Sequence, residues 1–177
     1  MYPGADVNAQ GGEYGNALQA ASRAGKQEIV RLLLDKGADV NAQGGEYGNA
    51  LYAASWAGNQ EIVRLLLKKG ADVNAQGGEY GNALQAASYE GEQEVVQLLL
   101  EKGADVNAQG GKYGNALQAA IKEGRVVTAR LLRQNGAVLS EETSIVPKPD
   151  QGRCLRLLRH LPPLFIEHRF VGACFFC

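Results

Sequence analysis

The sequence predicts an all-α solenoid of about four stacked repeats, each preceded by a short β-hairpin finger. The first indication is a 33-residue phrase, GADVNAQGGEYGNAL and onward, which begins at Gly4 and restarts at Gly37, Gly70 and Gly103. The second is a leucine-rich run at helical spacing in every copy. The third is a glycine after each predicted helix, where a left-handed residue is needed to end it. Such units cannot bury their apolar faces alone, so they stack.

The chain divides into a repeat region, residues 1–139, and a tail, residues 140–177. Full repeats are expected at 4–36, 37–69, 70–102 and 103–135, with a partial copy at 136–139. Composition changes after Leu139, because all three Cys, all four Phe, both His and four of the five Pro lie in the last 38 residues. The tail is therefore treated as a separate segment, expected to be partly disordered or packed on the last repeat.

Each repeat is predicted to contain two antiparallel helices, which in the first copy span about 17–24 and 27–36. Asn16 followed by Gln19 is a capping-box pattern, which satisfies free backbone groups at a helix start. Copies three and four keep it, but copy two has Tyr52 in place of the glutamine. Before the helices, residues 6–10 and 13–15 are expected to be extended and joined by a tight Gly-Gly turn.

The predicted core is an apolar seam shared by successive repeats. Its residues in the first copy are Leu18 and Ala21 of the first helix, with Ile29, Leu32 and Leu33 of the second. Arg133 stands where the other copies have leucine, which suits a terminal repeat with a wettable outer face. The first repeat lacks such a device and is expected to expose an apolar flank, as in a fragment or a truncated relative of a longer array.

Bulk composition argues against several functions. The net charge is −1, and residues 1–139 hold 13 Lys and Arg against 15 Asp and Glu, so no nucleic-acid partner is expected. The sequence shows neither a secretory signal nor an apolar run long enough to span a membrane. The repeats contain no Cys and no His, which fits an intracellular, cytoplasmic location and leaves no catalytic constellation. We predict no enzymatic activity and no cofactor.

The recurring residues closely resemble the ankyrin repeat. The pattern is Leu18-x-Ala20-Ala21, then Glu28-Ile29-Val30-x-Leu32-Leu33-Leu34, then Gly37-Ala38-Asp39-Val40-Asn41-Ala42. It departs from the family where Thr-Pro-Leu-His is expected, since residues 16–19 read NALQ, and Gly11 and Tyr14 replace the usual finger Asp and Gly. This variant is similar to the near-identical arrays at the C-termini of fungal NACHT-type, NOD-like receptors. No GxxxxGK[ST] motif of a nucleotide-binding domain is present.

The resemblance implies a non-catalytic module that binds a protein partner through a concave surface of fingers and first helices. The copies differ mainly at the end of the first helix, and Trp, Tyr and Arg often dominate binding energy. Solvated helix ends that diverged after duplication are the alternative. The predicted partner-binding residues in the helices are Arg23, Tyr52, Trp56, Tyr89, Glu90, Lys122 and Glu123.

Each finger also carries one tyrosine at the same place. These residues, Tyr14, Tyr47, Tyr80 and Tyr113, either pack against the next finger or contact the partner. Glu46 and Glu79 beside them are expected to be exposed and to contribute to partner binding.

The tail supports an alternative function, a structural or anchoring protein whose basic, Phe- and Cys-rich end makes the contact. Cys174 lies four residues from the end, as in a prenylation signal, but its neighbours fit that signal poorly. Metal binding by the tail is disfavoured, because its spacings match no standard zinc module. The residues considered for it are Cys154, His160, His168, Cys174 and Cys177.

Overall fold

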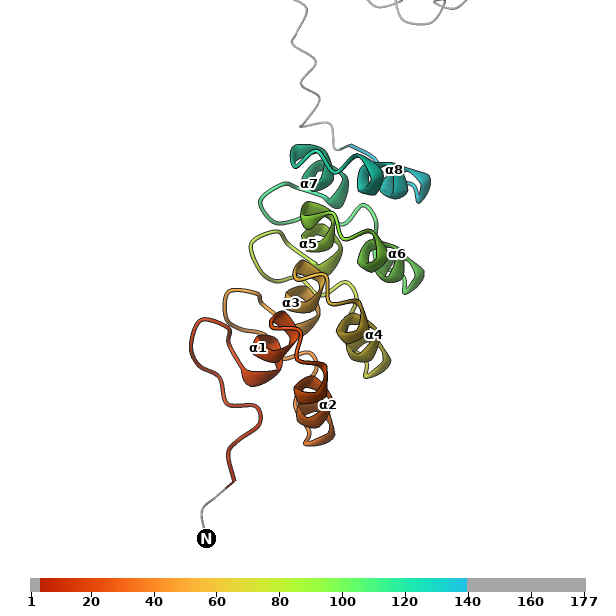
Figure 1. The fold of residues 1–177 in the computed structure, drawn as a ribbon. Coiled ribbons are helices and arrows are strands. Elements are labelled where there is room, and N and C mark those ends of the chain that lie inside the picture. The colour runs from red at the N-terminus through yellow and green to blue at the C-terminus, as the bar shows by residue number, and fades with distance from the viewer. Residues whose placement is uncertain (1–3, 140–177) are drawn as a thin grey trace, which may run out of the picture. The chain divides into compact units, whose positions relative to one another are not determined.

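The computed structural model describes residues 4–139, and these residues form eight α-helices in four consecutive pairs (Figure 1). The expectations for the tail, metal binding and lipidation included, lie outside the described residues. The helices are α1 (Ala17–Arg23), α2 (Gln27–Asp35), α3 (Ala50–Trp56), α4 (Gln60–Lys68), α5 (Ala83–Glu90), α6 (Gln93–Glu101), α7 (Ala116–Lys122) and α8 (Val126–Gln134).

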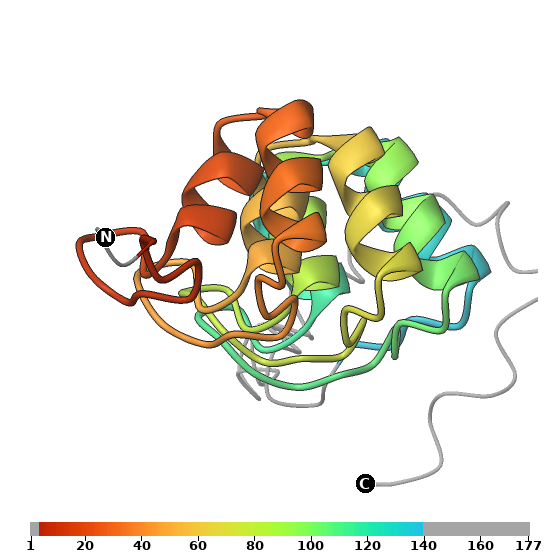
Figure 2. The same ribbon diagram turned by 90° about the horizontal axis from the view of Figure 1, so that it is seen from below.

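The first helices of the four pairs form one layer and the second helices form another. Figure 1 shows α1, α3, α5 and α7 between the finger loops and the outer row of α2, α4, α6 and α8. Seen from below in Figure 2, the loops gather on the side of the first helices. The all-α repeat architecture is therefore confirmed.

The starts of α1 and α5 form the predicted capping box, and at the start of α7 the Gln118 N–H donates to the Asn115 side chain at 2.9 Å. The Asn16 side chain accepts a hydrogen bond from the Gln19 N–H at 2.9 Å, and Gln19 Oε1 accepts one from the Asn16 N–H at 2.9 Å. The same reciprocal pair forms at the start of α5, whereas α3 keeps only the bond from the Tyr52 N–H to Asn49. Both bonds satisfy donors that a helix start would otherwise leave free.

The fingers are turns held by single bridges. Gly12 adopts a φ of +69°, the left-handed conformation that its turn requires. Residues 6–10 are not extended as expected, because the Ala9 N–H donates to the Asp6 carbonyl and closes a turn. The Asp6 carboxylate stabilises it by accepting from the Asn8 N–H. In the described residues the later fingers contain isolated antiparallel bridges, such as Gly44 with Gly48, in place of strands.

An asparagine at the base of each finger joins it to the next unit. Asn74 Nδ2 donates to the Gly103 carbonyl at 3.3 Å, and Asn74 Oδ1 accepts from the Asp105 N–H at 2.8 Å. The same two bonds to the following unit are made by Asn8, Asn41 and Asn107. This ladder keeps successive units in register.

The core is continuous from the first unit to the fourth. Leu18, Leu51, Leu84 and Leu117 of the first helices are all at most 2% exposed. The expectation that Ile29 and Leu32 belong to this core is wrong, because they are 49% and 57% exposed. Their counterparts in later units are covered by the preceding helix pair, and the described residues place no such pair before α2. The expected apolar flank is thus present.

Candidate functional site

The aromatic side chains at the ends of the first helices meet the finger tyrosines in two groups. We call Tyr14, Tyr47, Tyr52 and Trp56, together with Arg23, the first cluster. Tyr80, Tyr89 and Tyr113 form the second cluster. In each unit a short connection joins the finger to the first helix. The finger tyrosines and the aromatic residues of the first helices therefore lie on the same side of the stack.

In the first cluster, Arg23 links the first unit to the second. Its Nε–H donates to the Tyr47 hydroxyl at 2.8 Å, and its Cζ lies 4.4 Å from the centroid of the Trp56 ring. Tyr47 stacks on Tyr14 with centroids 5.9 Å apart and contacts Trp56 at 5.8 Å. A guanidinium over an indole is a cation–π contact, and here it fixes both side chains.

Tyr52 does not take the expected place in an exposed aromatic patch. It is 2% exposed and forms a second small core with Tyr47, Ala53 and Ala86. Its hydroxyl accepts a hydrogen bond from the Tyr80 N–H at 3.1 Å. Burial raises the pKa of Tyr52 to about 12. Tyr52 therefore lies beneath the surface and supports it from below.

The second cluster is a stack of three nearly parallel rings. Tyr80 and Tyr89 lie 4.2 Å apart with a 16° interplanar angle, and Tyr113 lies 5.8 Å from Tyr80 and 5.5 Å from Tyr89. All three are partly buried. Burial is also the main cause of the raised pKa of Tyr80. Tyr14 and Tyr80 therefore pack against the tyrosine of the next finger, as the packing interpretation predicts, and the partial exposure of Tyr80 and Tyr113 also leaves these two open to contact.

Charged residues surround the second cluster. Glu90, at the end of α5, is partly buried, and Lys122 and Glu123 at the end of α7 are exposed. Burial raises the pKa of Glu90, while the nearby Arg125 acts in the opposite direction. Arg125 itself donates from Nε to the Tyr89 carbonyl at 3.0 Å.

The glutamates of the fingers are exposed as predicted, but they are partly engaged within the stack. Glu79 pairs with Lys112 at 2.8 Å, and this contact raises the pKa of Lys112. The Glu46 N–H donates to the Glu13 carbonyl at 2.8 Å. These contacts join neighbouring fingers along their tips.

Neither a metal-binding group nor a membrane-spanning helix is found among the described residues. Across residues 4–139 no three His, Cys, Asp or Glu side chains are grouped so as to hold a metal ion. Within the same residues no helix has both the length and the apolar character needed to cross a bilayer. What the surface does present is aromatic rings flanked by charges of both signs.

Comparison with known families agrees with this architecture. A family model described as ankyrin repeats (3 copies) matches residues 1–77 and 76–143. This chain is an ankyrin-repeat protein. Ankyrin repeats generally mediate protein–protein interaction and are typically non-catalytic. A 30-residue segment is 67% identical to the azaphilone pigments biosynthesis cluster protein L of Monascus ruber, and the match covers 17% of this chain and 6% of that protein.

Sequence reasoning missed some residues that shape the ankyrin surface. Asn59 Nδ2 donates to the Arg23 carbonyl at 3.3 Å, and Arg125 Nε donates to the equivalent carbonyl, that of Tyr89, two units later. The signal was available, because this position changes in every copy: Lys26, Asn59, Glu92, Arg125. Variation among otherwise identical repeats marked it as clearly as it marked Trp56.

Proposed function

We propose that this ankyrin stack is a non-catalytic binding module that recognises a protein partner through the two aromatic clusters. The observation that carries the proposal is the gathering of Trp56, Tyr89 and Arg23 on one side of the stack, each partly exposed and each held by its neighbours. Aromatic and arginine side chains in such positions supply most of the affinity in protein interfaces.

The way these side chains are held favours rigid binding. Arg23 is fixed by Tyr47 and Trp56. Tyr89 is held by ring contacts with Tyr80 and Tyr113. Side chains that are already ordered lose little conformational entropy when a partner binds. The Asn ladder adds to this, because it fixes the spacing between the two clusters.

We also propose that this stack is the recognition segment of a receptor resembling the fungal NOD-like class. The repeat variant YGNALQAAS and the near identity of the first two copies support this role. The coding sequence upstream of Met1 tests it: a nucleotide-binding domain there is expected, and an unrelated gene boundary would contradict it.

Trp56 provides a direct experiment for the binding surface, because it is the single tryptophan of the chain. The full chain and the double variant Trp56→Ala/Tyr89→Ala would be used as baits in cell extract, with Val127→Ala as the matched control. Val127 is 54% exposed on α8, away from both clusters. Proteins retained by the wild type and the control but lost with the double variant support the proposal. Equal retention by all three baits contradicts it.

A purified protein recovered in this way would then be titrated against the wild-type chain while Trp56 emission is recorded. Burial of the indole in an interface is expected to shift the emission to shorter wavelength. Binding without any change in Trp56 emission would place the interface elsewhere on the stack.

A further inference from the structure

The two ends of the described stack each present an apolar face. On α2, Ile29 and Leu32 are 49% and 57% exposed, and we call this the α2 end face. At the other end, Ile121 of α7 and Val126 of α8 are 47% and 67% exposed. We call this second surface the α7–α8 end face.

Within the stack, the same positions are covered. Ile62, Val95 and Leu98, three of the counterparts of the α2 end face, are at most 2% exposed, and Leu65 is partly buried. The first three units carry a serine at the position of Ile121, and these serines are fully buried: Ser22, Ser55 and Ser88. The two end faces are therefore the two halves of a junction that the chain already makes three times between its own units.

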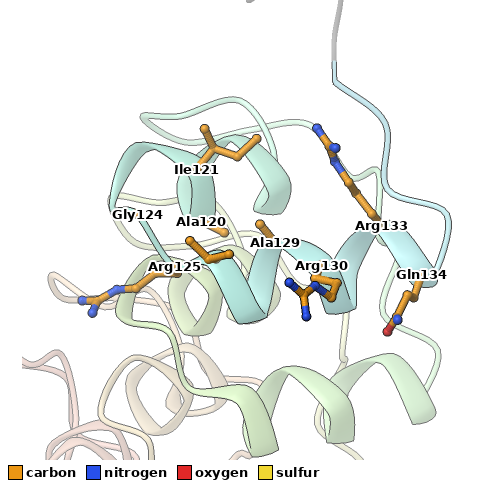
Figure 3. A pocket seen from close by; sticks show the side chains of 9 residues that line it. Ala120, Ile121, Gly124, Arg125, Ala129, Arg130, Arg133 and Gln134 are labelled. Atoms are coloured by element: carbon orange, nitrogen blue, oxygen red, sulfur yellow. The ribbon is translucent and has the colours of Figure 1, made fainter.

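The α7–α8 end face is hollowed and apolar at its centre. A cavity of about 600 Å³ opens there, lined by Ala120, Ile121, Val126 and Ala129, with arginines around it. Figure 3 shows Ile121 and Ala129 reaching the hollow from the two helices, and Arg130 and Arg133 at its border. The other units carry Ser and Gln at the places of Ile121 and Val126, so the last unit is the more apolar one.

We propose that this face binds the α2 end face of a second copy of the chain, head to tail, in the register of the internal junctions. Of the described surfaces, the α2 end face already has the complementary shape, because its helix pair repeats the sequence of the units that cover the inner junctions. The contact leaves Arg23, Trp56 and Tyr89, which carry the proposed partner binding, outside the junction.

The charges of the two faces are complementary in that register. In the groove between α4 and α6, Arg64 lies with Glu94, Leu98 and Glu101. The corresponding residues at the junction between copies are Arg130 on one side and Glu28, Leu32 and Asp35 on the other. Opposite charges also pair between neighbouring units elsewhere, as Lys69 does with Asp35 at 3.1 Å.

The fingers would continue across the same junction. Tyr14 is 40% exposed, whereas Tyr47, on which the ring of Tyr14 from the preceding finger stacks, is 8% exposed. Tyr14 of the second copy would stack on Tyr113, and Glu13 would face Lys112. Asn107 is already bonded to residues 136–139 of its own chain, as Asn8 is bonded to residues 37–40. The base of the last finger is therefore occupied, and the contact between two copies uses the helices and the finger tips.

A head-to-tail contact joins two different faces, and in the register of the internal junctions it extends the stack and leaves one free face at each end. The average mass of the full chain is therefore expected to rise steadily with concentration above the monomer value of 18.9 kDa. The tests are Leu32→Lys, which places a cation opposite Arg130, and Val126→Lys, which places one in the hollow beside the arginines. Each variant alone is expected to remain monomeric in sedimentation equilibrium.

Mixing the two variants decides the geometry. One intact face remains on each variant, so an equimolar mixture is expected to form a heterodimer of about twice the monomer mass and to stop there. Thermal unfolding followed by circular dichroism verifies that both variants are folded. A wild type that stays monomeric at high concentration, or two variants that do not complement each other, would overturn the proposal.

Discussion

The guanidinium of Arg23 lies over the indole of Trp56, and the two residues come from consecutive repeats, 33 positions apart in the chain. They occupy the same place in their own units, at the end of the first helix. The residues at a position that differs between repeats thus contact each other across neighbouring repeats. Sequence divergence at this place has produced a cation–π pair across the junction between the first and second units.

Replacing Arg23 should release Trp56. Arg23→Ala removes the cation–π contact and the bond to Tyr47, so the free energy of unfolding should fall by about 1 kcal/mol. Emission of the single tryptophan should move to longer wavelength as water reaches the ring. Arg23→Lys keeps the charge but not the planar group, and an intermediate shift is expected. Unchanged emission in Arg23→Ala would show that the contact does not persist in solution.

Tyr52 occupies a place that the chain otherwise gives to glutamine. Gln19 Nε2 donates to the Ala42 and Gly48 carbonyls at 3.1 and 2.9 Å, which joins one unit to the next finger. Tyr52 fills the same space with a ring, and a Cβ at Gly78 would run into that ring. The two side chains thus offer alternative ways to seal one junction, by hydrogen bonds or by apolar contact.

We therefore expect Tyr52→Ala and Tyr52→Gln to differ strongly. The alanine variant leaves a cavity in the small core and should lose about 3–5 kcal/mol of unfolding free energy. The glutamine variant can bond to carbonyl groups of the next finger and should lose less than about half of that. Urea unfolding of both variants checks this, and equal losses would mean that a glutamine side chain at this position does not reach those carbonyls.

Much of the fold follows from the 33-residue period, because each element signal is written several times. The helices begin and end within one residue of the predicted positions, since Asn caps and glycine stops mark them locally. An exposed flank on the first unit was predicted, but that Ile29 and Leu32 form it could not be read from their own repeat, because their burial depends on what lies beside the unit. An identical sequence is buried one unit later, at Ile62.

The site was predictable as a region but not in its details. Helical spacing placed Tyr52 and Trp56 on one face, yet a helix packed between a finger and another helix buries part of that face. Only Trp56, one turn closer to the helix end, reaches the surface. The break between the two clusters was equally hidden, because four identical finger tyrosines suggested one continuous stack.

The asparagine ladder should determine how cooperatively the stack unfolds. Asn41→Ala removes both bonds from the junction between the second and third units, and a loss of about 1–2 kcal/mol is expected. Because repeat stacks are stabilised by nearest-neighbour contacts, a weaker central junction should also broaden the urea transition. Gln109→Ala, which removes only a local bond to Asn107, is the control and should leave the transition sharp.

Glu90 should make stability depend on pH in an unusual direction for a carboxylate. Its pKa is raised above the ordinary value of 4.5 by burial, so the folded chain holds this proton more tightly than the unfolded chain. Its contribution to stability is therefore complete below about pH 4.5 and is lost as the pH rises through the folded pKa. Glu90→Gln cannot ionise and should be more stable than the wild type at about pH 7.

The comparison requires two pH values and a charge control. In urea unfolding, the gain from Glu90→Gln should be present at about pH 7 and should shrink towards zero at about pH 4. Glu94→Gln removes the same charge from an exposed place on α6 and corrects for the change in net charge. If Glu90→Gln were instead less stable than the wild type at neutral pH, attraction between Glu90 and Arg125 would outweigh burial. The ionised Glu90 carboxylate would then stabilise the folded chain through Arg125, which is bonded to the Tyr89 carbonyl.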